Sequence, residues 1–552
     1  MRSFAAVTCA SRVPLAALVV VAVALGAAPV ESQVLYGALV IEVHDQSDAA
    51  VPGADVTVTE TETNWTRRGV TNERGTASFS TVPPGTFTVR VTLSGFTEHQ
   101  QTGIRVTPNN VTRVSSVLEV GDLTDTVTVE AGVAVLQTDR ADVRTELRSE
   151  QLENLPVPPG RNYQNLFVLV PGISPPQNMH SVAVNPSRGL AFSSNGTTRN
   201  ANTIRIEGAI ANNLWLPHVA AYVPALEAID TVSVVTSTFD ADLGLSGGMS
   251  ADVQMKSGTN ELRGAAFEYH YNERLKARPY FLPEDEEKPN VSQNQFGGTL
   301  GGPIVRDKLF FFGSYEGTRD RQTAQRFGTV PTAAMRNGDL SASTSPIYDP
   351  LTGNPDGSGR TPFPGNIIPR NRLDPIVQKL IADLPLPTFE DRLTENYFAT
   401  GEFAFTRHKT DVKVNLNATN DLNISGRLGW LSYNFDSPPM FGDLGGEPVH
   451  EPAGKMGAGF GDTYTITGNL SYVLTPTLLF DSYTGITLID VISEPPRIDE
   501  NLGRDFLEIP GTNGQDRLYG GWPQFDVSSF STIGQAGSAG SPYVDDNWQY
   551  QY

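Results

Sequence analysis

The residues able to bind a metal ion or to move protons are spread along this chain rather than gathered. No two of its histidines have the His-x-x-x-His spacing that places two imidazoles on one face of a zinc-binding helix. The histidines are His44, His99, His180, His218, His270, His408 and His450. The single cysteine, Cys9, stands near the N-terminus. These spacings predict neither a metal centre nor a thiol nucleophile.

Two glycine-rich stretches could cradle a phosphate, but each departs from the pattern that this chemistry needs. Met255 stands where a glycine precedes the lysine of a phosphate-binding loop. Gly298 to Gly302 lacks the strand-then-helix context of a dinucleotide site, and Pro303 follows at once. The acidic run Glu284–Glu287 could attract cations, although a solvated loop tip is the favoured interpretation. The sequence therefore predicts a protein that is not an enzyme and holds no cofactor.

Charge and the N-terminal residues indicate where the protein acts. The 552 residues carry a formal net charge of −21, which repels phosphate backbones and disfavours nucleic acid as a partner. Met1 to Ser32 has the basic start, the apolar run (Val13 to Ala27) and the small residues of a secretory signal cut before Gln33. A secreted chain that keeps no cysteine is typical of the bacterial envelope. No later segment has 18 uninterrupted apolar residues, so any membrane insertion has to use strands.

Residues 33–120 show the pattern of a small β-sandwich. Short alternating runs of valine, isoleucine and phenylalanine are separated by turn signals such as Pro52-Gly53 and Pro83-Pro84-Gly85. Residues 132–259 mix short helical and strand patterns, including Gln151 to Pro156 and Ile229 to Val235, and predict a compact mixed α/β domain.

From residue 260 the pattern changes to that of membrane strands. Thr410 to Asn417, Leu422 to Trp430 and Tyr464 to Leu474 each alternate apolar or aromatic residues with polar ones over roughly ten residues. One face of each strand would meet lipid and the other the lumen of a barrel.

The connections between these strands supply a second signal. Short turns alternate with long Gly/Pro-rich loops, as the two sides of a membrane barrel require. The short turns are 306–308, 418–421 and 475–477, and the long loops are 273–292, 319–402, 434–460 and 490–542. A soluble sandwich also alternates apolar and polar residues, but nothing forces this rhythm on its loops, so the barrel is favoured.

The amino-acid sequences of several segments are specific enough to suggest a family. VPGADVTVTE near the N-terminus, LPVPPGRNYQNL, KSGTNELRGAAFEYHY and QNQFGGTLGGPI in the centre, and GNIIPRNRLDP further on are the main examples. With them the chain resembles TonB-dependent outer-membrane transporters, specifically the Oar-like group with an added carboxypeptidase-regulatory-like domain. The resemblance implies a signal peptide (1–32), the added β-sandwich domain (33–120), a linker (121–131), a plug (132–259) and barrel strands (260–552).

The same resemblance implies an activity, a location and partners. The protein would sit in the lipid of the outer membrane and import an extracellular solute, with the inner-membrane complex acting through TonB. The solute could be a siderophore, oligosaccharide, peptide or vitamin. A surface scaffold for binding or adhesion, without transport, is the alternative.

Two groups of residues are the candidate sites. The segment Asp125, Thr126, Val127, Thr128 and Val129 resembles a TonB box, an extended peptide that adds as a strand to a partner's sheet, although it could also be an ordinary final strand. In the plug, Arg199, Asn200, Asn202, Arg205 and Glu207 could face the solute, and a structural role for them is equally compatible with the sequence. The loop 319–402 is expected to make the main solute contacts, because long barrel loops lie outside and carry recognition.

The number of strands conflicts with a plugged barrel. Seven strands are clear and residues 543–552 could form an eighth, whereas eight strands enclose only their own side chains and plugged transporters use about 22. We therefore expect the sequence to be the front part of a longer protein, although the aromatic ending Trp548, Tyr550 and Tyr552 could also be the terminal strand of a complete barrel.

Overall fold

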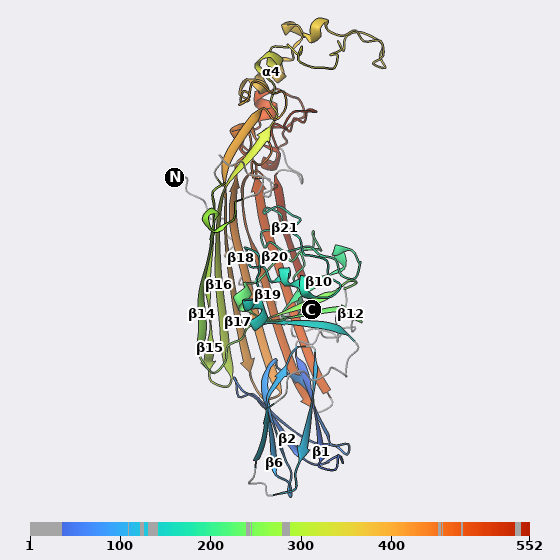
Figure 1. Cartoon of the computed structure of the whole chain (residues 1–552), viewed down its shortest axis with the longest axis vertical. Helices are drawn as coiled ribbons and strands as arrows, with labels where there is room; N and C mark the ends of the chain where they lie inside the picture. The colour runs from blue at the N-terminus through green and yellow to red at the C-terminus, as the bar shows by residue number, and fades with distance from the viewer. Residues whose placement is uncertain are drawn as a thin grey trace.

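The computed structural model describes residues 36–108, 110–121, 126–130, 142–238, 243, 246–278, 288–450, 454, 456–475, 478–535 and 542–551. The proposed signal peptide therefore lies outside the described residues. The fold is mainly β and has three parts (Figure 1): a small domain at the lower end, a tall curved sheet, and a compact domain against that sheet. In the described part of the chain, no helix is long and apolar enough to cross a membrane.

The N-terminal domain is a β-sandwich, as the sequence predicts. Its two sheets have the strand orders β4-β1-β7 and β3-β2-β5-β6-β8. The strands are β1 (Gly37–Asp45), β2 (Asp55–Glu60), β3 (Thr66–Val70), β4 (Thr76–Val82), β5 (Gly85–Thr92), β6 (Glu98–Val106), β7 (Val111–Leu118) and β8 (Thr126–Glu130). Alternate residues such as Leu39, Ile41, Val56 and Val58 are buried between the sheets, because successive side chains of a strand point to opposite faces.

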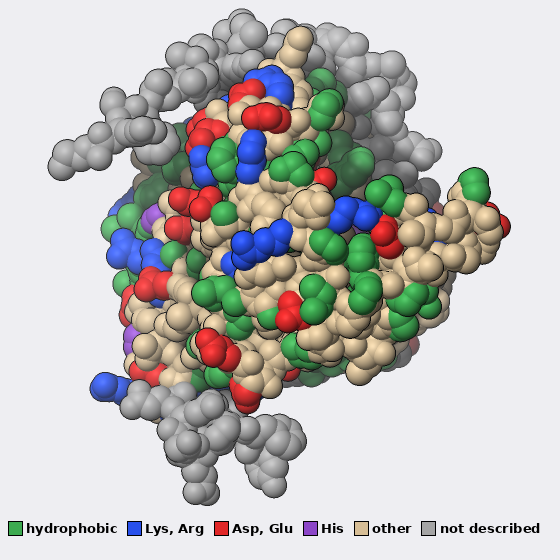
Figure 2. Space-filling view, turned by 90° about the horizontal axis from the view of Figure 1, so that it is seen from above, with side chains coloured by type: hydrophobic (Ala, Val, Ile, Leu, Met, Phe, Trp, Pro, Cys, Tyr) green, Lys and Arg blue, Asp and Glu red, His purple; other side chains and the backbone are tan. Residues whose placement is uncertain are grey.

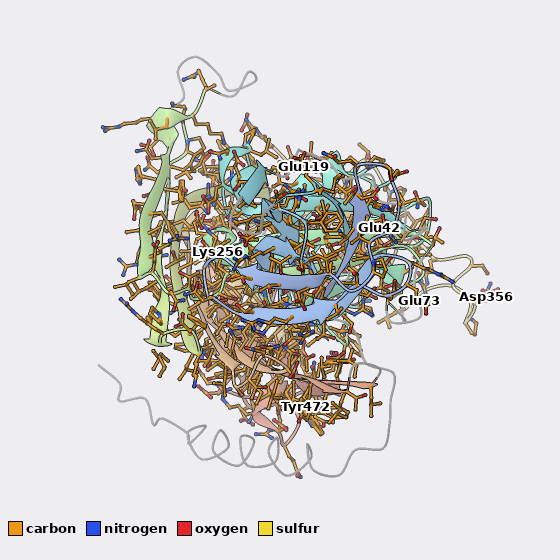
Figure 3. The ribbon with its side chains drawn as sticks, turned by 90° about the horizontal axis from the view of Figure 1, so that it is seen from below. Glu42, Glu73, Glu119, Lys256, Asp356 and Tyr472 are labelled. Atoms are coloured by element: carbon orange, nitrogen blue, oxygen red, sulfur yellow. The ribbon has the colours of Figure 1, made fainter. Side chains whose placement is uncertain are left out.

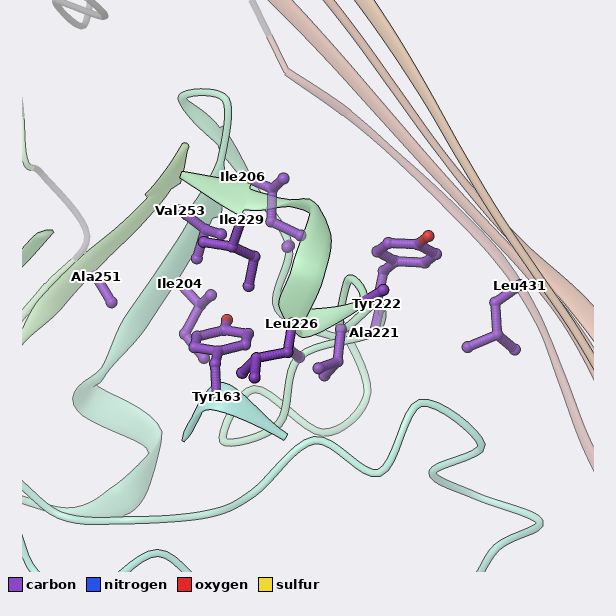
Figure 4. Packing of buried hydrophobic residues seen from close by; sticks show 14 of the residues in the cluster. Tyr163, Ile204, Ile206, Ala221, Tyr222, Leu226, Ile229, Ala251, Val253 and Leu431 are labelled. Atoms are coloured by element: carbon purple, nitrogen blue, oxygen red, sulfur yellow. The ribbon is translucent and has the colours of Figure 1, made fainter. Parts of the chain in front are cut away.

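The compact domain, which we call the plug, contains one five-stranded sheet of order β11-β10-β13-β12-β9. Its elements are β9 (Val143–Arg148), α2 (Ser149–Asn154), β10 (Thr203–Ile206), β11 (Ala209–Ile210), β12 (Ile229–Ser237) and β13 (Ser250–Met255), with 3-10 turns at Tyr163–Leu169, Arg199–Ala201 and Leu226–Ala228. Tyr163 and Leu226 pack against Ile204 and Ile229 in its core (Figure 4). Both helical and strand elements are present, in agreement with the predicted mixed α/β domain.

The tall sheet, which we call the wall, is an antiparallel meander of eight strands in chain order. The strands are β14 (Arg263–Asn272), β15 (Val291–Val305), β16 (Leu309–Gly328), β17 (Tyr397–Asn417), β18 (Leu422–Ser437), β19 (Gly457–Thr475), β20 (Leu478–Glu494) and β21 (Tyr543–Gln551). The sheet is open, with β14 and β21 at its two edges. The possible eighth strand of the sequence is thus confirmed as β21.

Burial on the wall is the reverse of that in a water-soluble sheet. Along one stretch of β17, Val412 and Val414 keep 43% and 37% of their surface exposed, whereas Asp411 and Lys413 keep 1% and 5%. In β18 the exposed residue is Leu428 and the buried one is its neighbour Arg427. Apolar side chains therefore face outward to lipid, and the charged side chains face the plug.

The long connections begin later than the sequence analysis placed them. β16 continues to Gly328 and β17 starts at Tyr397, so the predicted loop 319–402 is wrong at both ends and the loop spans 329–396. β18, β19 and β20 likewise extend into the predicted loops 434–460 and 490–542. The extensions pair with neighbouring strands, and outward residues in them, such as Thr400 and Glu402, are polar, so no apolar alternation marks them in the sequence.

The long loops pack on one another around a shared apolar core. Val330 and Leu380 of the loop 329–396 join Met440 and Phe441 of the next long loop and Trp522 of the last one. The loop 329–396 also contains α3 (Ala333–Arg336) and α4 (Pro375–Ala382), where Asp374 caps α4 by accepting from two backbone N–H groups. Seen from above (Figure 2), positive and negative side chains are mixed over the described part of this surface. We call the long loops that share this apolar core the loop module.

The outward face of the wall predicts the effect of a charge placed in lipid. Leu428→Arg should destabilise the membrane-inserted protein by roughly 2–4 kcal/mol, the cost of arginine near the bilayer midplane. Unfolding in lipid vesicles measures it. Leu351→Arg is the matched control, because Leu351 is 79% exposed in the loop module and should change stability little. Equal effects of the two substitutions would contradict the assignment of the lipid face.

Candidate functional site between the plug and the wall

The plug contacts the wall through both apolar and charged side chains. Leu431 and Tyr433 of β18, together with Phe403 and Phe405 of β17, belong to the same buried cluster as the plug core. In Figure 4 the ring of Tyr222 points from the plug toward the wall strands, and Leu431 points back toward the plug. The surrounding contacts are polar.

One ion pair joins the plug directly to the wall. Lys413 Nζ lies 2.8 Å from Glu207 Oε1, and both side chains are buried. The lysine also donates to the carbonyl of Met255, and the same carboxylate oxygen accepts from the Met255 N–H at 2.7 Å. Glu207 and Gly208 form the two-residue turn between β10 and β11, both with positive φ (52° and 81°), as a type I′ hairpin turn requires. The turn thus presents the carboxylate to the wall.

A second group of charges is paired within the wall and touches the plug by hydrogen bonds. Asp411 of β17 pairs with Arg427 of β18 and accepts from the hydroxyl of Tyr222 at 2.9 Å. The Arg427 guanidinium lies 5.1 Å from the centre of the Tyr222 ring. Asp411 also accepts from the Ser314 hydroxyl of β16 at 3.4 Å, so wall and plug residues together satisfy the carboxylate.

A third group lies one step further up the same strands. Glu316 of β16 pairs with Lys409 at 2.6 Å and with Arg407 at 3.6 Å. Arg407 also donates to the backbone carbonyls of Pro186 and Ser187 in the plug, at 3.2 and 3.1 Å. Charges buried without partners are costly, and the wall pairs these charges within itself. The Arg407 hydrogen bonds to the two carbonyls connect this group to the plug.

The residues that the sequence put forward for solute contact do not form one pocket. Asn200 is exposed, and Arg199 donates to the Met179 sulfur. Asn202 is buried and donates to the Phe192 carbonyl, and Arg205 is buried and donates to Ser250. Glu207 pairs with the wall, as described above. A solute-contacting role for these residues stays a prediction, and the contacts of Asn202, Arg205 and Glu207 are structural ones.

A cavity that sequence reasoning missed lies between all three parts of the molecule. Its volume is about 640 Å³. Pro83 and Pro84 line it from the N-terminal domain, Glu207 and Lys256 from the plug, and the face of β17 and β18 that carries Lys413 and Asn423 from the wall. No sequence signal could have found it, because its lining residues are brought together only by the packing of the three parts.

The plug also contains a histidine pair that was not anticipated. The Nε2 atoms of His180 and His218 lie 2.5 Å apart. Burial, followed by the positive charge of Arg199 and the neighbouring His180, lowers the pKa of His218 to about 4. Among the described residues, no group of three or more His, Cys, Asp or Glu side chains could hold a metal ion.

The segment resembling a TonB box is not a free linker. Thr126–Glu130 form β8, which pairs in parallel with β6 at the edge of the N-terminal domain, so the ordinary-strand interpretation describes its place in the fold. Thr128 is exposed, and Asp125 lies outside the described residues.

The N-terminal domain is fastened to both other parts. Arg67 donates to the Asn420 carbonyl in the turn after β17 and lies 3.8 Å from Asp421, and Glu62 pairs with Arg263 at the start of β14. On the plug side, Arg105 lies 3.3 Å from Asp230. Seen from below (Figure 3), the strands of this domain cross in front of the plug, with Lys256 of the plug beside them.

An outward apolar face, an inward charged face and an internal packed domain define an outer-membrane β-barrel protein with a plug. The chain belongs to the outer membrane beta barrel domain family, whose model matches residues 254–552. Residues 38–119 match the carboxypeptidase regulatory-like domain. The protein is accordingly placed in the outer membrane.

Several individual proteins are similar to this chain. The chain is 27% identical over 279 residues to the TonB-dependent transporter Oar of Myxococcus xanthus, covering 48% of this chain and 25% of Oar. It thus spans about a quarter of that relative's length. Among solved structures, the outer membrane transporter YddB of Escherichia coli matches 71% of this chain and 43% of its own, with 11% identity and a TM-score of 0.42. A ferric enterobactin receptor (PfeA) mutant of Pseudomonas aeruginosa covers 71% and 44%, with 11% identity and a TM-score of 0.34.

The plug–wall ion pair predicts a non-additive pair of substitutions. Lys413→Met should destabilise the plug by roughly 3–5 kcal/mol, because it leaves the Glu207 carboxylate buried and unpaired. Adding Glu207→Gln should recover most of the loss, since the neutral amide can still accept from Met255. Urea unfolding of the plug, monitored by its resistance to protease, measures both the loss and the recovery of stability. Additive losses in the double variant would show that the two side chains do not interact.

The histidine pair predicts a dependence of stability on pH. The pKa of His218, about 4, lies below the value of about 6.5 of an unfolded histidine. Between these values the unfolded chain binds a proton that the folded chain does not, so the free energy of unfolding falls as the pH decreases from about 6.5 to about 4. His218→Gln should flatten this slope in thermal unfolding, and His44→Gln in the N-terminal domain is the control. Equal slopes in wild type and His218→Gln would contradict the assignment.

Proposed function

We propose that this protein is a TonB-dependent outer-membrane receptor that binds an extracellular solute and imports it through a plugged barrel. The observation that carries the proposal is a plug packed against the inner face of a membrane wall through a shared apolar cluster and the buried ion pair of Lys413 with Glu207. The relationship to Oar supports it, because that protein is described as a TonB-dependent transporter. The partners in this proposal are the solute, outer-membrane lipid and TonB.

The distribution of the ion pairs favours a plug that can move. Glu316 with Lys409 and Asp411 with Arg427 are pairs within the wall, and they stay intact when the plug is displaced. Of these three pairs, Lys413 with Glu207 alone crosses from wall to plug. The other polar contacts described above are hydrogen bonds from the Tyr222 hydroxyl to Asp411 and from Arg407 to plug carbonyls, which water can replace at small net cost. Displacement of the plug therefore has to break the ion pair of Lys413 with Glu207 and separate the apolar cluster, while the charge pairs within the wall persist.

Transport through this wall has one further requirement. β14 and β21 expose unpaired backbone edges in the described sheet, and backbone groups in hydrocarbon have to be hydrogen-bonded within protein. A working wall therefore needs strands paired with both edges. The solute would enter from the loop module, and the cavity beside Glu207 lies at the other end of the plug.

A surface scaffold for binding or adhesion is the second candidate function. The loop module favours it, because a shared apolar core and exposed side chains such as Tyr348 and Leu351 could hold a partner without transport. The two functions differ in their need for energy. Ser187, buried between plug and wall, should react as Ser187→Cys with a maleimide only in energised cells if the plug moves, and should stay unreactive in a scaffold.

Deleting the segment 125–129 from the full-length protein tests the proposal. Energy-dependent solute accumulation and binding of the purified periplasmic domain of TonB should both be lost, because the segment is the proposed strand for the coupling protein. Surface binding of the solute should persist. Deleting 355–359 in the loop module is the matched control and should leave TonB binding unchanged. Undiminished TonB binding after deletion of 125–129 would refute the assignment of this segment.

A further inference from the structure

The segment proposed to bind TonB already has a strand partner in the structure. β8 pairs in parallel with β6, from Glu98 opposite Thr126 to Thr102 opposite Glu130. It is the last strand of its sheet, and no other described strand pairs with its outer edge. The sheet belongs to the domain at the lower end of the molecule in Figure 1, away from the loop module. β8 is thus an edge strand on the side where a periplasmic protein would approach.

The contact between β8 and β6 is of the same kind as the contact expected with the coupling protein. Both depend on backbone N–H and C=O groups, and strand addition makes few demands on side chains. The pairing covers five residues and is parallel, an arrangement slightly less stable per residue than the antiparallel one. Each hydrogen bond that β8 loses to β6 could therefore be regained with another strand.

The anchoring of the N-terminal domain decides whether β8 can work while it stays in place. The domain is tied to the wall by Arg67 with Asp421 and Glu62 with Arg263. A pull on β8 docked to β6 would act on this anchored domain. The plug begins at β9 (Val143), further along the chain, so a pull reaches it along the backbone once β8 has left β6.

We propose that β6 is the resting partner of β8 and that TonB binds β8 by strand exchange, displacing it from β6. This inference rests on the proposed function. The N-terminal domain then acts as a holder that keeps the coupling segment ordered until an extended strand of the partner replaces β6. After the exchange, the domain remains on the wall turns while the plug is free to follow β8.

A reversible cross-link tests the exchange. Gln100 and Thr128 are register partners on β6 and β8, and neighbouring strands lie about 4.8 Å apart, within the Cα separation that a disulfide spans. The full chain would carry Gln100→Cys and Thr128→Cys. The matched control is Thr57→Cys with Arg68→Cys, which joins β2 to β3 in the same sheet and changes no residue that pairs with β6 or β8.

The readout is the affinity for the purified periplasmic domain of TonB. The oxidised Gln100–Thr128 cross-link should weaken binding at least about tenfold, reduction should restore it, and the control should bind equally in both states. Undiminished binding by the oxidised cross-link would overturn the exchange while leaving the proposed function standing. Absence of TonB binding to the unmodified chain would overturn the proposed function, and the exchange with it.

Discussion

Backbone hydrogen bonding in a medium without water is the constraint on which this structure depends. In hydrocarbon, each N–H and C=O of the wall needs a partner inside the protein, and the paired strands of the meander supply it. β17, for example, is in continuous register with β16 from Tyr397 to Leu416. Because side chains alternate across a strand, this backbone sends one set of residues to lipid and the other inward. The inward set includes charges, and those charges need partners of their own.

The inward charges of the wall find their partners partly within the wall and partly in the plug. Wall charges mostly neutralise one another across neighbouring strands, as Asp411 and Arg427 do. The plug completes the hydrogen bonding with the Tyr222 hydroxyl and with backbone carbonyls rather than with many charges. Displacement of the plug therefore leaves the pair of Asp411 with Arg427 intact, whereas Lys413 loses its partner Glu207. The crossing pair of Lys413 with Glu207 adds a specific contact, because the turn geometry aims the Glu207 carboxylate at the wall.

The sequence predicts the parts of this fold that follow from local periodicity. The alternation around Leu428 and Trp430 identifies lipid-facing residues, and the turn signals of the first 120 residues identify the sandwich. The upper halves of β16 and β17 were not predicted, because outward residues there, such as Gln325 and Glu402, are polar and the apolar alternation no longer identifies the strand. The pairing of Lys413 with Glu207 could not be predicted from the sequence for another reason. The two residues are 206 positions apart, and only the packing of the plug against β17 brings them together.

The place of β8 shows a third limit. The sequence of Thr126–Glu130 is equally compatible with an extended linker and with a strand, because a five-residue β-prone segment does not indicate which strand it pairs with. The parallel partner β6 lies earlier in the chain, beyond β7, and no turn signal links the two. Its docking is a property of the tertiary fold.

The shared core of the loop module has a consequence for how the outer surface can change over time. Leu380, Phe441 and Trp522 come from three different connections and bury one another, so a substitution at any of them alters the support of all three. New binding specificities would therefore arise at the tips, around Tyr348 and Leu351, where exposed residues can vary without disturbing that core. Amino-acid substitutions are expected to accumulate around Tyr348 and Leu351, while the residues of the shared apolar core change slowly.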